Sequence, residues 1–563
     1  MRGSWVQIPL EALIYYIGGI MAVKYVFVTG GVVSGLGKGI TASSLGRLLK
    51  ARGYKVTMQK FDPYLNIDPG TMNPIQHGEV FVTEDGAETD LDLGHYERFI
   101  DENLTKISTV TSGKIYWSVL NKERKGEYGG GTVQVIPHIT NEIKSRFYKS
   151  AESLKNKGKN SKDDKDIEIA IIEVGGTVGD MESEPYIEAI RQFRLELGET
   201  NVVHVHVTLV PYIEASEELK TKPTQNSVRD LQGMGIQPDI LVCRAKYPLS
   251  QSIRSKISLY CNVDPSCVIE NGNVDILYEV PLLLEKQGFA KAALKCMGLK
   301  DKKPDLAEWI KIVDNMKNPT KEITIAIAGK YVVLHDAYLS VVEAIKAAAG
   351  FYKAKANLVL IDTEKVNSKD ISKLMKGVNG VIVPGGFGIR GIEGMVLIAK
   401  YAREKKIPYL GICLGMQVAI IEFARNVLMY KDANSIEFDM DTTHPVINLL
   451  PDKVGVLDIG GTLRLGSYPC KLEKNSKCYK LFGKSEITER HRHRYEVNND
   501  YRDDFTKSGL ILAGVSPDEK IVEMIELKNH PFYIATQSHP EFKSRVNNPH
   551  PLFKGFINAI IDK

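Results

Sequence analysis

The sequence contains little of what distinguishes secreted, membrane-bound and nucleic-acid-binding proteins. Only seven of its 563 residues are cysteine, an odd number, and no two of them form a Cys-x-x-Cys pair. This argues against a disulfide framework and a structural zinc site, and it favours a reducing, cytoplasmic location. The net charge is only +4, so neither nucleic acid nor an anionic membrane is required as a partner. With 43% hydrophobic and 25% charged residues, the composition is that of an ordinary globular protein of two or three domains.

The apolar stretch near the N-terminus is too short to cross a membrane. It runs from Leu13 to Ile20, follows Glu11, and is interrupted by Lys24 before it could reach spanning length. No small-residue cleavage pattern follows it. We therefore expect residues 1–20 to be a dispensable extension, with Met21 as a possible start, in preference to a targeting peptide.

Two regions of the chain alternate apolar strands with amphipathic helical segments, the pattern of parallel α/β sheets. A stretch bearing Lys and Pro separates them, and we place a linker at 298–321. The predicted domains are then 21–297 and 322–563. Residues 151–166, rich in Lys, Ser, Asn and Asp, are expected to be a solvated loop or a disordered insertion.

One cysteine lies at the junction of a predicted strand and a predicted helix. The segment Ile407–Gln417 holds an apolar run, then Gly-x-Cys-x-Gly around Cys413, and a helix expected to begin near Leu414. Such a sharp turn exposes the thiol above the sheet edge, and the helix N-terminus favours its thiolate. Downstream, His539 could take the proton, and Glu541 could orient the histidine. The alternative is a buried structural cysteine with an unrelated surface histidine.

This segment and the glycine turn Pro384–Gly388 resemble a class I, or triad, glutamine amidotransferase domain. Domains of that class hydrolyse glutamine through a thioester and release ammonia. The residues alone agree, because Gly380–Pro384 is a short apolar strand that ends in a glycine turn. Backbone N–H groups at this turn and at Leu414 could hold the oxyanion of a tetrahedral intermediate. A plain tight loop is the alternative for the turn by itself.

A phosphate-binding loop is predicted near the start of the first domain. The strand Tyr25–Thr29 runs into the glycine-rich segment Gly30–Gly39, and a helix follows. A strand, a glycine loop, Lys38 and a helix N-terminus together form a phosphate cradle. The segment is not a regular Walker A motif, which would need Gly at the position of Val32 and Ser or Thr at that of Gly39. The missing hydroxyl implies that magnesium is held by carboxylates elsewhere.

Two carboxylates are candidates for that magnesium site. Asp92 lies in the segment Glu88–Tyr96, and Glu173 closes the largely apolar run Ile167–Glu173. Magnesium takes one or two carboxylates together with phosphate oxygens and water, which suits acids near a phosphate loop. Solvated loop charges are the alternative for each acid.

Longer segments resemble the CTP synthase family over the chain from about Met21 to near the C-terminus. The matching segments, besides the phosphate loop, are Asp85–Arg98, Val133–Thr140, Lys220–Gln225 and Arg490–Asn498. The resemblance implies an α/β protein with a P-loop-type parallel-sheet synthetase domain followed by a class I glutamine amidotransferase domain. The extension and the 151–166 insertion depart from the family's pattern.

The resemblance implies a reaction and its partners. The family makes CTP from UTP, ATP and glutamine: ATP phosphorylates the uracil O4, and ammonia displaces the phosphate. Magnesium is the implied cofactor, GTP the implied activator and CTP the implied inhibitor, and a homotetramer is the implied assembly. Neither a nucleic-acid partner nor a membrane partner is expected.

The resemblance also assigns residues in the synthetase half, where point charges and metal suit phosphoryl transfer. The implied ATP-binding residues are Ser34, Gly35, Leu36, Gly37, Lys38, Gly39, Lys60 and Asp92. The implied UTP- or CTP-binding residues are Ser34, Asp180, Glu182, Lys220, Gln225 and Lys256. The implied magnesium ligands are Asp92 and Glu173, and His77 matches a residue beside the family's ammonia passage.

In the amidotransferase half, the resemblance adds to the triad of Cys413, His539 and Glu541. The implied oxyanion-hole donors are the N–H groups of Gly386 and Leu414. The implied glutamine-binding residues are Gly386, Gln417, Glu437 and Arg494, of which the arginine could pair bidentately with a carboxylate. Phe387 is a candidate contact for the guanine base of GTP.

Two other functions fit part of the sequence. One is a different P-loop amidotransferase, of the kind that amidates cobyrinate side chains, which gives no reason for Lys220–Gln225 as written. The other is a nucleotide-switched partition or scaffold protein with a silent glutaminase domain. The presence of Cys413, His539 and Glu541 together argues against a silent domain.

Overall fold

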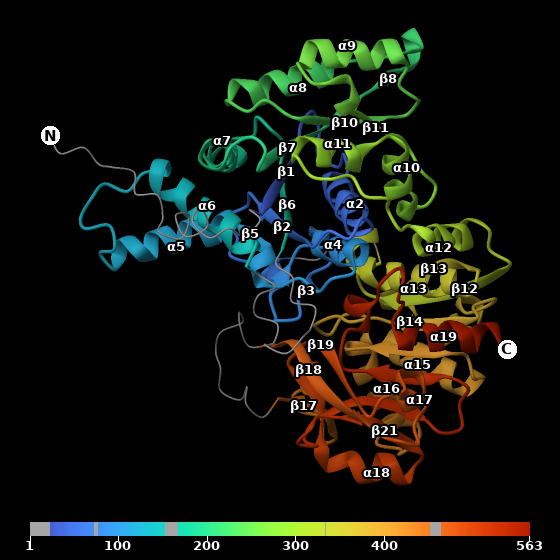
Figure 1. Ribbon diagram of the computed structural model, residues 1–563. Helices are drawn as coiled ribbons and strands as arrows, with labels where there is room; N and C mark the ends of the chain where they lie inside the picture. Colours follow the sequence, from blue (N-terminus) through green and yellow to red (C-terminus); the bar gives the residue numbers. More distant parts are fainter. Residues whose placement is uncertain (1–22, 73–76, 153–166, 333, 451–462, 563) are drawn as a thin grey trace. The chain divides into compact units, whose positions relative to one another are not determined.

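The computed structural model describes residues 23–72, 77–152, 167–332, 334–450 and 463–562 (Figure 1). The chain divides into two compact units: residues 107–306 join the segment that ends at Ile67, and residues 307–563 join the segment 68–106. The expected extension at residues 1–20 lies outside the described residues, as does all of the 151–166 insertion except its first two residues.

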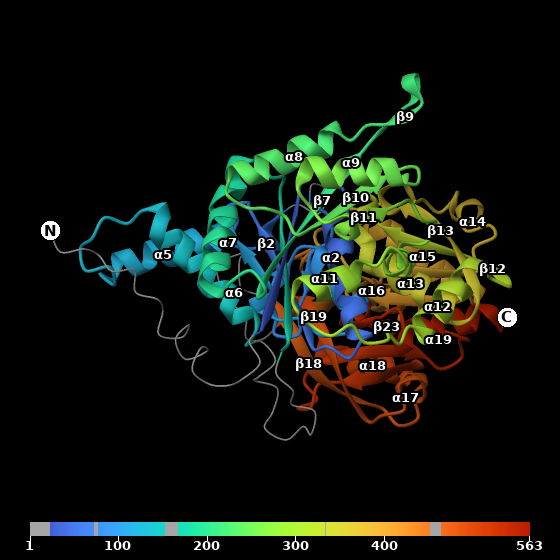
Figure 2. The same ribbon diagram turned by 45° about the horizontal axis from the view of Figure 1, so that its top comes forward.

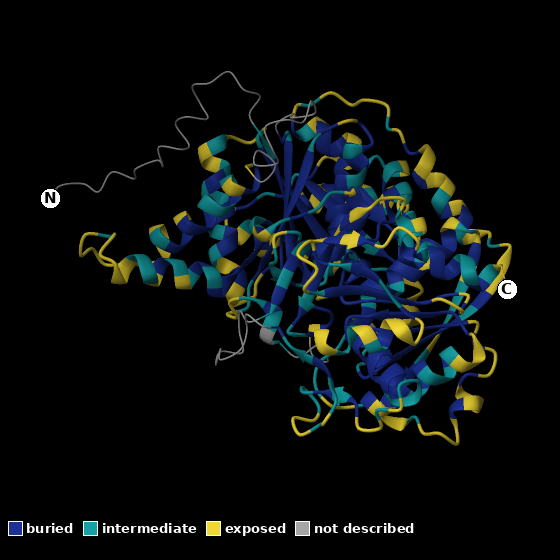
Figure 3. Ribbon diagram, turned by 90° about the horizontal axis from the view of Figure 1, so that it is seen from below, coloured by how far each residue is buried: buried dark blue, intermediate teal, exposed yellow. Residues whose placement is uncertain are grey.

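The first unit is built on a parallel sheet of seven strands. The strands, in their order across the sheet, are β11 (Val268–Asn271), β10 (Ile240–Ala245), β7 (Val202–Val210), β1 (Lys24–Gly30), β6 (Ile169–Val174), β2 (Val56–Asp62) and β5 (Thr109–Thr111). The central strands are buried along nearly their whole length, and β1 and β6 are largely apolar, as expected for a parallel sheet covered on both faces (Figure 3). The strand predicted at Tyr25 is β1, and the run that ends in Glu173 is β6.

Helices cover both faces of this sheet. On one face, α6 (Thr140–Ser150) and α7 (Glu184–Leu197) pack on β1 and β2 through the edge-to-face rings of Phe27, Phe147 and Phe193. On the other face lies α2 (Lys38–Lys50), the helix predicted after the phosphate loop, with α10 (Val280–Lys286) and α11 (Phe289–Cys296) against it. The carboxyl ends of the strands and the N-terminus of α2 thus meet at the same edge of the sheet.

The remaining elements of the first unit surround the sheet. Helices α8 (Lys222–Gly233) and α9 (Gln251–Cys261) lie side by side, and the hairpin β8 (Tyr212–Ile213) to β9 (Glu218–Leu219) projects beyond them (Figure 2). Helix α5 (Ser112–Arg124) begins at the N-cap residue Thr111, whose hydroxyl accepts a hydrogen bond from the Lys114 N–H.

The second unit contains a mixed sheet of nine strands. Their order is β13 (Ala354–Asp362), β12 (Lys321–Gly329), β14 (Gly380–Val383), β15 (Tyr409–Ile412), β23 (Tyr533–Thr536), β22 (Val522–Leu527), β21 (Leu510–Val515), β18 (Arg464–Leu472) and β19 (Glu486–His493). The first five strands are parallel to their neighbours, and the pairings from β23 to β19 are antiparallel. A small second sheet pairs β16 (Asn434–Ser435), β17 (Pro445–Leu449) and β20 (Tyr495–Val497).

Alternate side chains of these parallel strands point to opposite faces of the sheet and contribute to two separate hydrophobic cores. One core holds α15 (Ile392–Lys405) and α16 (Leu414–Asn426), and the other holds α13 (Leu339–Phe351) and α19 (Pro551–Ile561). Three short helices, α14 (Ile371–Leu374), α17 (Lys477–Phe482) and α18 (Arg502–Lys507), complete this part of the unit. The predicted α/β fold class is confirmed.

Residues 68–106 pack with the second unit although they lie in the predicted synthetase domain. They hold β3 (Phe81–Val82), β4 (Glu88–Thr89) and α4 (Asp92–Ile100). The Arg492 side chain donates to Glu88, and the Ser340 N–H and hydroxyl donate to Glu79. The buried Glu79 and the partly buried Glu88 therefore join this segment to the amidotransferase elements.

The predicted linker contains regular structure. Helix α12 (Ala307–Lys317) lies inside 298–321, and its Trp309 is buried against Phe99. The lysines and prolines of this stretch suggested a connection, but part of the stretch is an amphipathic helix with a buried tryptophan. Among the described residues, no helix combines the length and apolarity needed to cross a membrane.

Candidate active sites

Cys413 occupies a strained turn between β15 and α16. Its backbone has φ 52° and ψ −102°, a conformation that a side-chain-bearing residue adopts only when the surroundings enforce it. The neighbouring glycines allow the turn: a Cβ on Gly411 would lie 2.7 Å from the Gly415 carbonyl oxygen, and one on Gly415 would lie 2.1 Å from the Val383 carbonyl oxygen. The Gly-x-Cys-x-Gly spacing is thus a packing requirement, and the helix begins at Leu414 as predicted.

The three predicted triad residues gather in the second unit. The His539 Nδ1 lies 2.7 Å from the Glu541 Oε1, and both side chains are buried. Gly385 lies close to both His539 and Cys413. A Cβ atom on Gly385 would lie 2.8 Å from the His539 Cε1 and 3.6 Å from the Cys413 Cβ, so the histidine and the cysteine are neighbours. The Gln537 amide also reaches the Cys413 sulfur, at 3.5 Å.

The electrostatics of this group favour a protonated histidine. Burial by itself would lower the pKa of His539, but the negative charges of Glu541 and Cys413 outweigh burial and raise the pKa to about 10. The Phe542 ring stacks on the imidazole, with 5.0 Å between ring centroids and 10° between planes. A protonated, oriented imidazole beside a thiol can stabilise the thiolate and later give up its proton.

The glycine turn after β14 borders the same cavity. This cavity, of about 70 Å³, is lined by Cys413, His539 and Glu541 and by residues of the 384–387 turn. A Cβ on Gly386 would lie 3.3 Å from the Leu414 side chain, so the two predicted oxyanion donors are neighbours. Leu414 is the first residue of α16, so the helix contains no carbonyl that could accept a hydrogen bond from its N–H, and this N–H can serve an oxyanion.

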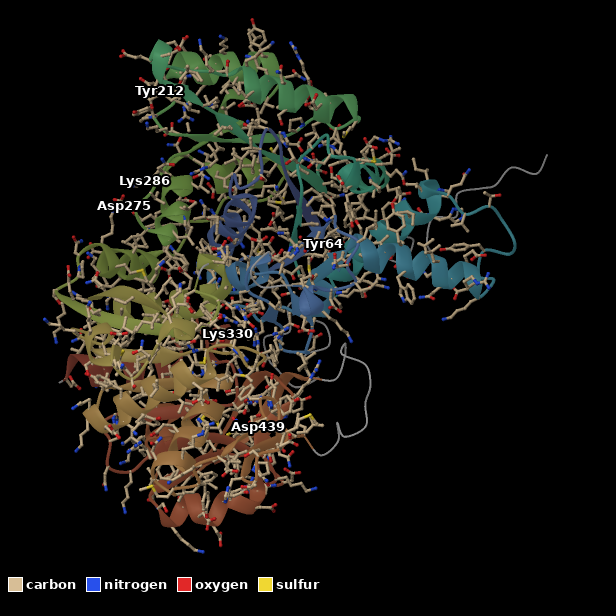
Figure 4. All side chains as sticks on the ribbon, turned by 180° about the vertical axis from the view of Figure 1, so that it is seen from behind. Tyr64, Tyr212, Asp275, Lys286, Lys330 and Asp439 are labelled. Carbon is tan, nitrogen blue, oxygen red and sulfur yellow. The ribbon has the colours of Figure 1, made fainter. Side chains whose placement is uncertain are left out.

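Lys330, labelled in Figure 4, contacts this turn and was not among the predicted residues. Its Nζ donates to the carbonyls of Phe387, at 3.0 Å, and Gly388. Burial, partly offset by Glu437, lowers the pKa of Lys330 to about 8. The sequence offered one signal, a lysine directly after the strand β12, which resembles any surface lysine at a strand end.

We expect Lys330→Met to lower glutamine-dependent kcat/KM about ten- to hundredfold and to leave ammonia-dependent turnover unchanged. The variant removes charged hydrogen bonds to two carbonyls, each worth about 1.5–3 kcal/mol, and frees the turn. Steady-state kinetics with each nitrogen source measures the effect. Lys346→Met, which removes an exposed lysine from α13, is the control. Equal kinetics for the two variants would contradict an anchoring role.

The predicted glutamine-binding residues lie around this turn. The Glu437 carboxylate accepts from the Gly388 N–H at 2.8 Å, and burial raises its pKa while Lys330 and Arg494 act in the opposite direction. Gln417 is buried on α16 and donates to the Tyr495 carbonyl. The site therefore combines a carboxylate, an amide and a guanidinium. These polar groups suit a free amino acid, which carries both an ammonium group and a carboxylate.

Phe387 is only partly buried, and its ring faces the Arg492 guanidinium, 5.0 Å from the ring centroid. The phenyl group is therefore a candidate stacking surface, and it already has a cation–π partner.

The phosphate loop of the first unit has the predicted strand–loop–helix form. Gly37 precedes α2 in the left-handed region, at φ 83°, and Gly35 has φ 76°. Val32, where a regular Walker A motif has glycine, is also left-handed at φ 77°, a costly conformation for a β-branched residue. The Lys38 Nζ donates to the Gly176 carbonyl at 2.7 Å, so the lysine lies against the turn after β6.

Two more predicted residues meet in the first unit. The Lys60 Nζ lies 3.7 Å from the Glu173 Oε1 and 3.6 Å from the Asp62 Oδ1, and all three side chains are nearly fully buried. Asp62 was missed by sequence reasoning; its position at the end of β2 is the signal that could have found it. The cluster holds two carboxylates and one lysine, which suits a magnesium ion that keeps several waters.

The predicted uridine-nucleotide residues fall into separate groups. Lys220 pairs with Glu218, and the pKa of that carboxyl is lowered first by Lys220 and in smaller part by Lys256. Gln225 is buried on α8 and donates to the Thr221 hydroxyl. Asp180 accepts from the Thr177 N–H. The structure thus brings the two lysines near one carboxylate.

The last predicted residues are open to solvent or lie in the other unit. Ser34 and Glu182 are exposed. Asp92 is the first residue of α4, and His77 is an exposed residue before β3, so both belong to the second unit. Across the described ranges, no group of three or more His, Cys, Asp or Glu side chains forms a ready metal site. The assignment of Asp92 and Glu173 as magnesium ligands stays a prediction.

Comparison with known proteins agrees with these observations. Residues 24–299 match the family described as CTP synthase N-terminus, and residues 333–559 match glutamine amidotransferase class-I. A CTP synthase of Caldanaerobacter subterraneus is 59% identical over 96% of this chain and 98% of its own length. Another, of Ruminiclostridium cellulolyticum, is 58% identical over 96% of this chain and 99% of its own. The chain belongs to the CTP synthase family.

Among solved structures, the glutaminase domain of a Trypanosoma brucei CTP synthase with bound acivicin is 35% identical, with a TM-score of 0.41, and covers 43% of this chain and 94% of its own. Membership of the CTP synthase family confirms the predicted activity: the chain is a glutamine-hydrolysing ligase that forms CTP from UTP. It also decides against a corrinoid amidotransferase and a silent scaffold protein.

Proposed function

We propose that the two units divide this reaction, with glutamine hydrolysis in the second and phosphoryl transfer centred on the phosphate loop of the first. The observation that carries the proposal is the meeting of Cys413, in a strained turn, with the His539–Glu541 pair. Formation of CTP from UTP with ATP, Mg²⁺ and either glutamine or ammonia tests it. Ammonia-dependent synthesis without a glutaminase reaction would contradict the proposed triad.

In the glutaminase step, the Cys413 thiolate attacks the glutamine carboxamide and the protonated His539 gives its proton to the leaving ammonia. The N–H groups of Gly386 and Leu414 hold the oxyanion. Water activated by the neutral imidazole then hydrolyses the thioester. The Glu437 carboxylate and the Arg494 guanidinium bind the amino acid, the former at its ammonium group and the latter at its carboxylate.

In the synthetase step, Lys38 and Lys60 bind the phosphoryl oxygens of ATP while the γ-phosphoryl group moves to the uracil O4 and negative charge builds up on the leaving ADP. The buried position of Lys60, beside two carboxylates, supports this role, because desolvated charge acts strongly there. Lys220 and Lys256 bind the triphosphate of UTP, with Gln225 nearby. Asp180 and Glu182 complete the nucleotide site.

Magnesium fits the carboxylates of the first unit, and we propose Glu173 as one of its protein ligands; Asp92, the other ligand that the family resemblance implies, belongs to α4 of the second unit and stays a prediction. When bound, magnesium neutralises charge on the phosphate oxygens during transfer. Asp62, next to Lys60, is a further carboxylate within the same buried group. Removal of magnesium with a chelator is expected to stop both nitrogen-source reactions and to spare glutaminase chemistry.

We propose GTP as an activator that contacts Phe387, CTP as an inhibitor at the UTP site, and a homotetramer as the working form. The seven cysteines are free thiols, which supports a reducing, cytoplasmic location. His77 is proposed to lie beside the route of ammonia.

We expect Glu541→Gln to lower glutamine-dependent turnover by about a hundredfold or more and to move its alkaline limb to lower pH. The Glu541 charge is the largest favourable influence on the raised pKa of His539, so its loss lowers that pKa and the imidazole loses its proton earlier. A pH profile of glutaminase kcat from pH 6 to 10 measures the shift. The exposed residue Glu486, changed to Gln, is the control. An unmoved alkaline limb would contradict this reading of the pair.

A further inference from the structure

A buried ion cluster lies directly behind the turn that carries His539. It consists of Glu97 on α4, Arg490 on β19 and Arg545, which follows the turn in sequence. The side chains of Glu97 and Arg490 are fully buried, and that of Arg545 is 6% exposed. All three belong to the second unit.

Glu97 balances both arginines of the cluster. The two Arg490 Nη atoms donate to the carboxylate at 2.9 and 3.1 Å, and the Arg545 Nη2 donates at 2.6 Å. The Leu104 N–H adds a fourth hydrogen bond at 2.8 Å. Burial by itself would lower the pKa of Arg490, but Glu97 and Glu84 outweigh burial and raise it. Glu97 is thus the carboxylate that the two desolvated guanidinium groups share, while Glu84 accepts from one of them only, through the Arg490 Nε at 2.8 Å.

The arginines hold the catalytic turn at two points. The Phe542 carbonyl accepts from the Arg545 Nη1 at 3.0 Å and from the Arg490 Nη1 at 3.3 Å. The His539 N–H donates to the Arg490 carbonyl at 2.8 Å. Because Phe542 stacks on the His539 ring, a shift of this carbonyl would tilt the imidazole away from Cys413.

Glu97 comes from outside the amidotransferase region. It lies 393 residues before Arg490, in the stretch matched by the CTP synthase N-terminus family, whereas the turn lies in the stretch matched by glutamine amidotransferase class-I. An amidotransferase domain cut at residue 322 would therefore have two buried arginines without their common carboxylate.

We propose that Glu97 is a positioning residue for glutamine hydrolysis, acting through Arg490 and Arg545 on the His539–Glu541 pair. It touches neither glutamine nor the thiol; it fixes the turn on which the histidine is presented. This inference rests on the proposed triad. A parallel Cys413→Ala variant separates the two, because glutaminase activity in that variant would overturn the triad itself and not the anchoring of the turn.

The test uses the full chain and compares glutamine-dependent with ammonia-dependent CTP formation. We expect Glu97→Gln to lower glutamine-dependent kcat at least about thirtyfold, with KM for glutamine within about threefold of normal. Ammonia-dependent turnover should stay within about twofold. The alkaline limb of the glutaminase pH profile should move to lower pH, because a displaced histidine is less well paired with Glu541.

Two further variants keep the test decisive. Arg545→Lys keeps the charge beside Glu97 but loses the guanidinium that donates to Glu97 and to the Phe542 carbonyl at the same time, and we expect a fall in glutamine-dependent kcat of about tenfold with the same selectivity. It decides the matter if Glu97→Gln does not fold. Asp101→Asn is the matched control: this exposed residue directly follows α4, its carboxylate lies 3.9 Å from the Arg545 Nε, and the kinetics of the variant should equal those of the unmodified protein.

Two results would overturn the proposal. The first is a folded Glu97→Gln or Arg545→Lys variant with glutamine-dependent kcat within about twofold of normal. The second is a parallel fall of both activities with a lower melting temperature and an unmoved pH profile, which would mean that the cluster only stabilises the fold.

Discussion

Replacement of Cys413 by alanine is expected to abolish glutamine-dependent CTP formation while synthesis from added ammonia continues. Cys413 is the residue at the strained turn before α16, and the phosphate loop belongs to the other compact unit. Without the thiol no thioester forms, so the loss should reach the detection limit, about a thousandfold or more. Rates of CTP formation with glutamine and with ammonium chloride measure the two activities.

The control for this variant is Cys470→Ala, which removes another buried thiol from the same unit. Burial raises the pKa of Cys470, so it is a poor nucleophile, and both activities should stay near normal. Loss of ammonia-dependent synthesis in a folded Cys413→Ala protein would contradict the proposed division of labour between the units.

The sequence predicted the parts of the structure that depend on local patterns. The turn at Cys413 was predictable because two glycines and an apolar strand at that spacing leave few other arrangements, and α16 begins at the expected residue. The strand that ends near Glu173 and the helix after the phosphate loop follow from the same kind of signal. Periodicity and glycine placement describe short stretches of chain well.

Contacts between distant segments were beyond these patterns. The segment 68–106 resembles part of a synthetase, yet it packs with residues 307–563 through buried ion pairs such as Glu97 with Arg490. An ion pair between residues 393 positions apart leaves no periodic trace in the sequence. Lys330 was missed for a similar reason: its partners are backbone carbonyls, which any residue supplies.

The unusual phosphate loop was predicted only in part. The sequence showed that Val32 departs from a Walker A motif, but it did not show that this valine adopts an unfavourable backbone conformation. In the structure Val32 keeps the left-handed conformation that glycine would adopt freely. The adjacent Gly31 has no space for a side chain, because a Cβ there would lie 1.7 Å from the Ser227 hydroxyl oxygen. Close packing of Ser227, on α8, against Gly31 therefore restricts the conformation of the loop.

Replacement of Lys38 by alanine is expected to abolish CTP synthesis with either nitrogen source. Lys38 is the first residue of α2 and the only lysine of the glycine-rich loop, and its Nζ already lies against the turn after β6. In the reaction the ammonium group would face phosphoryl oxygens on which negative charge spreads. Losing such a contact costs about 3–4 kcal/mol of transition-state stabilisation, a fall in kcat of about two hundredfold or more.

The decisive measurement for Lys38→Ala is ammonia-dependent turnover at saturating ATP and UTP, because it isolates the synthetase step from glutamine hydrolysis. Nucleotide-free glutaminase activity serves as the check that the second unit is folded, and it should persist. Lys125→Ala, which removes an exposed lysine after α5 in the same unit, controls for loss of positive charge. Near-normal ammonia-dependent turnover in Lys38→Ala would show that phosphate is bound elsewhere. A parallel loss in Lys125→Ala would show that net charge, and not the placement of one ammonium group in the loop, governs the rate.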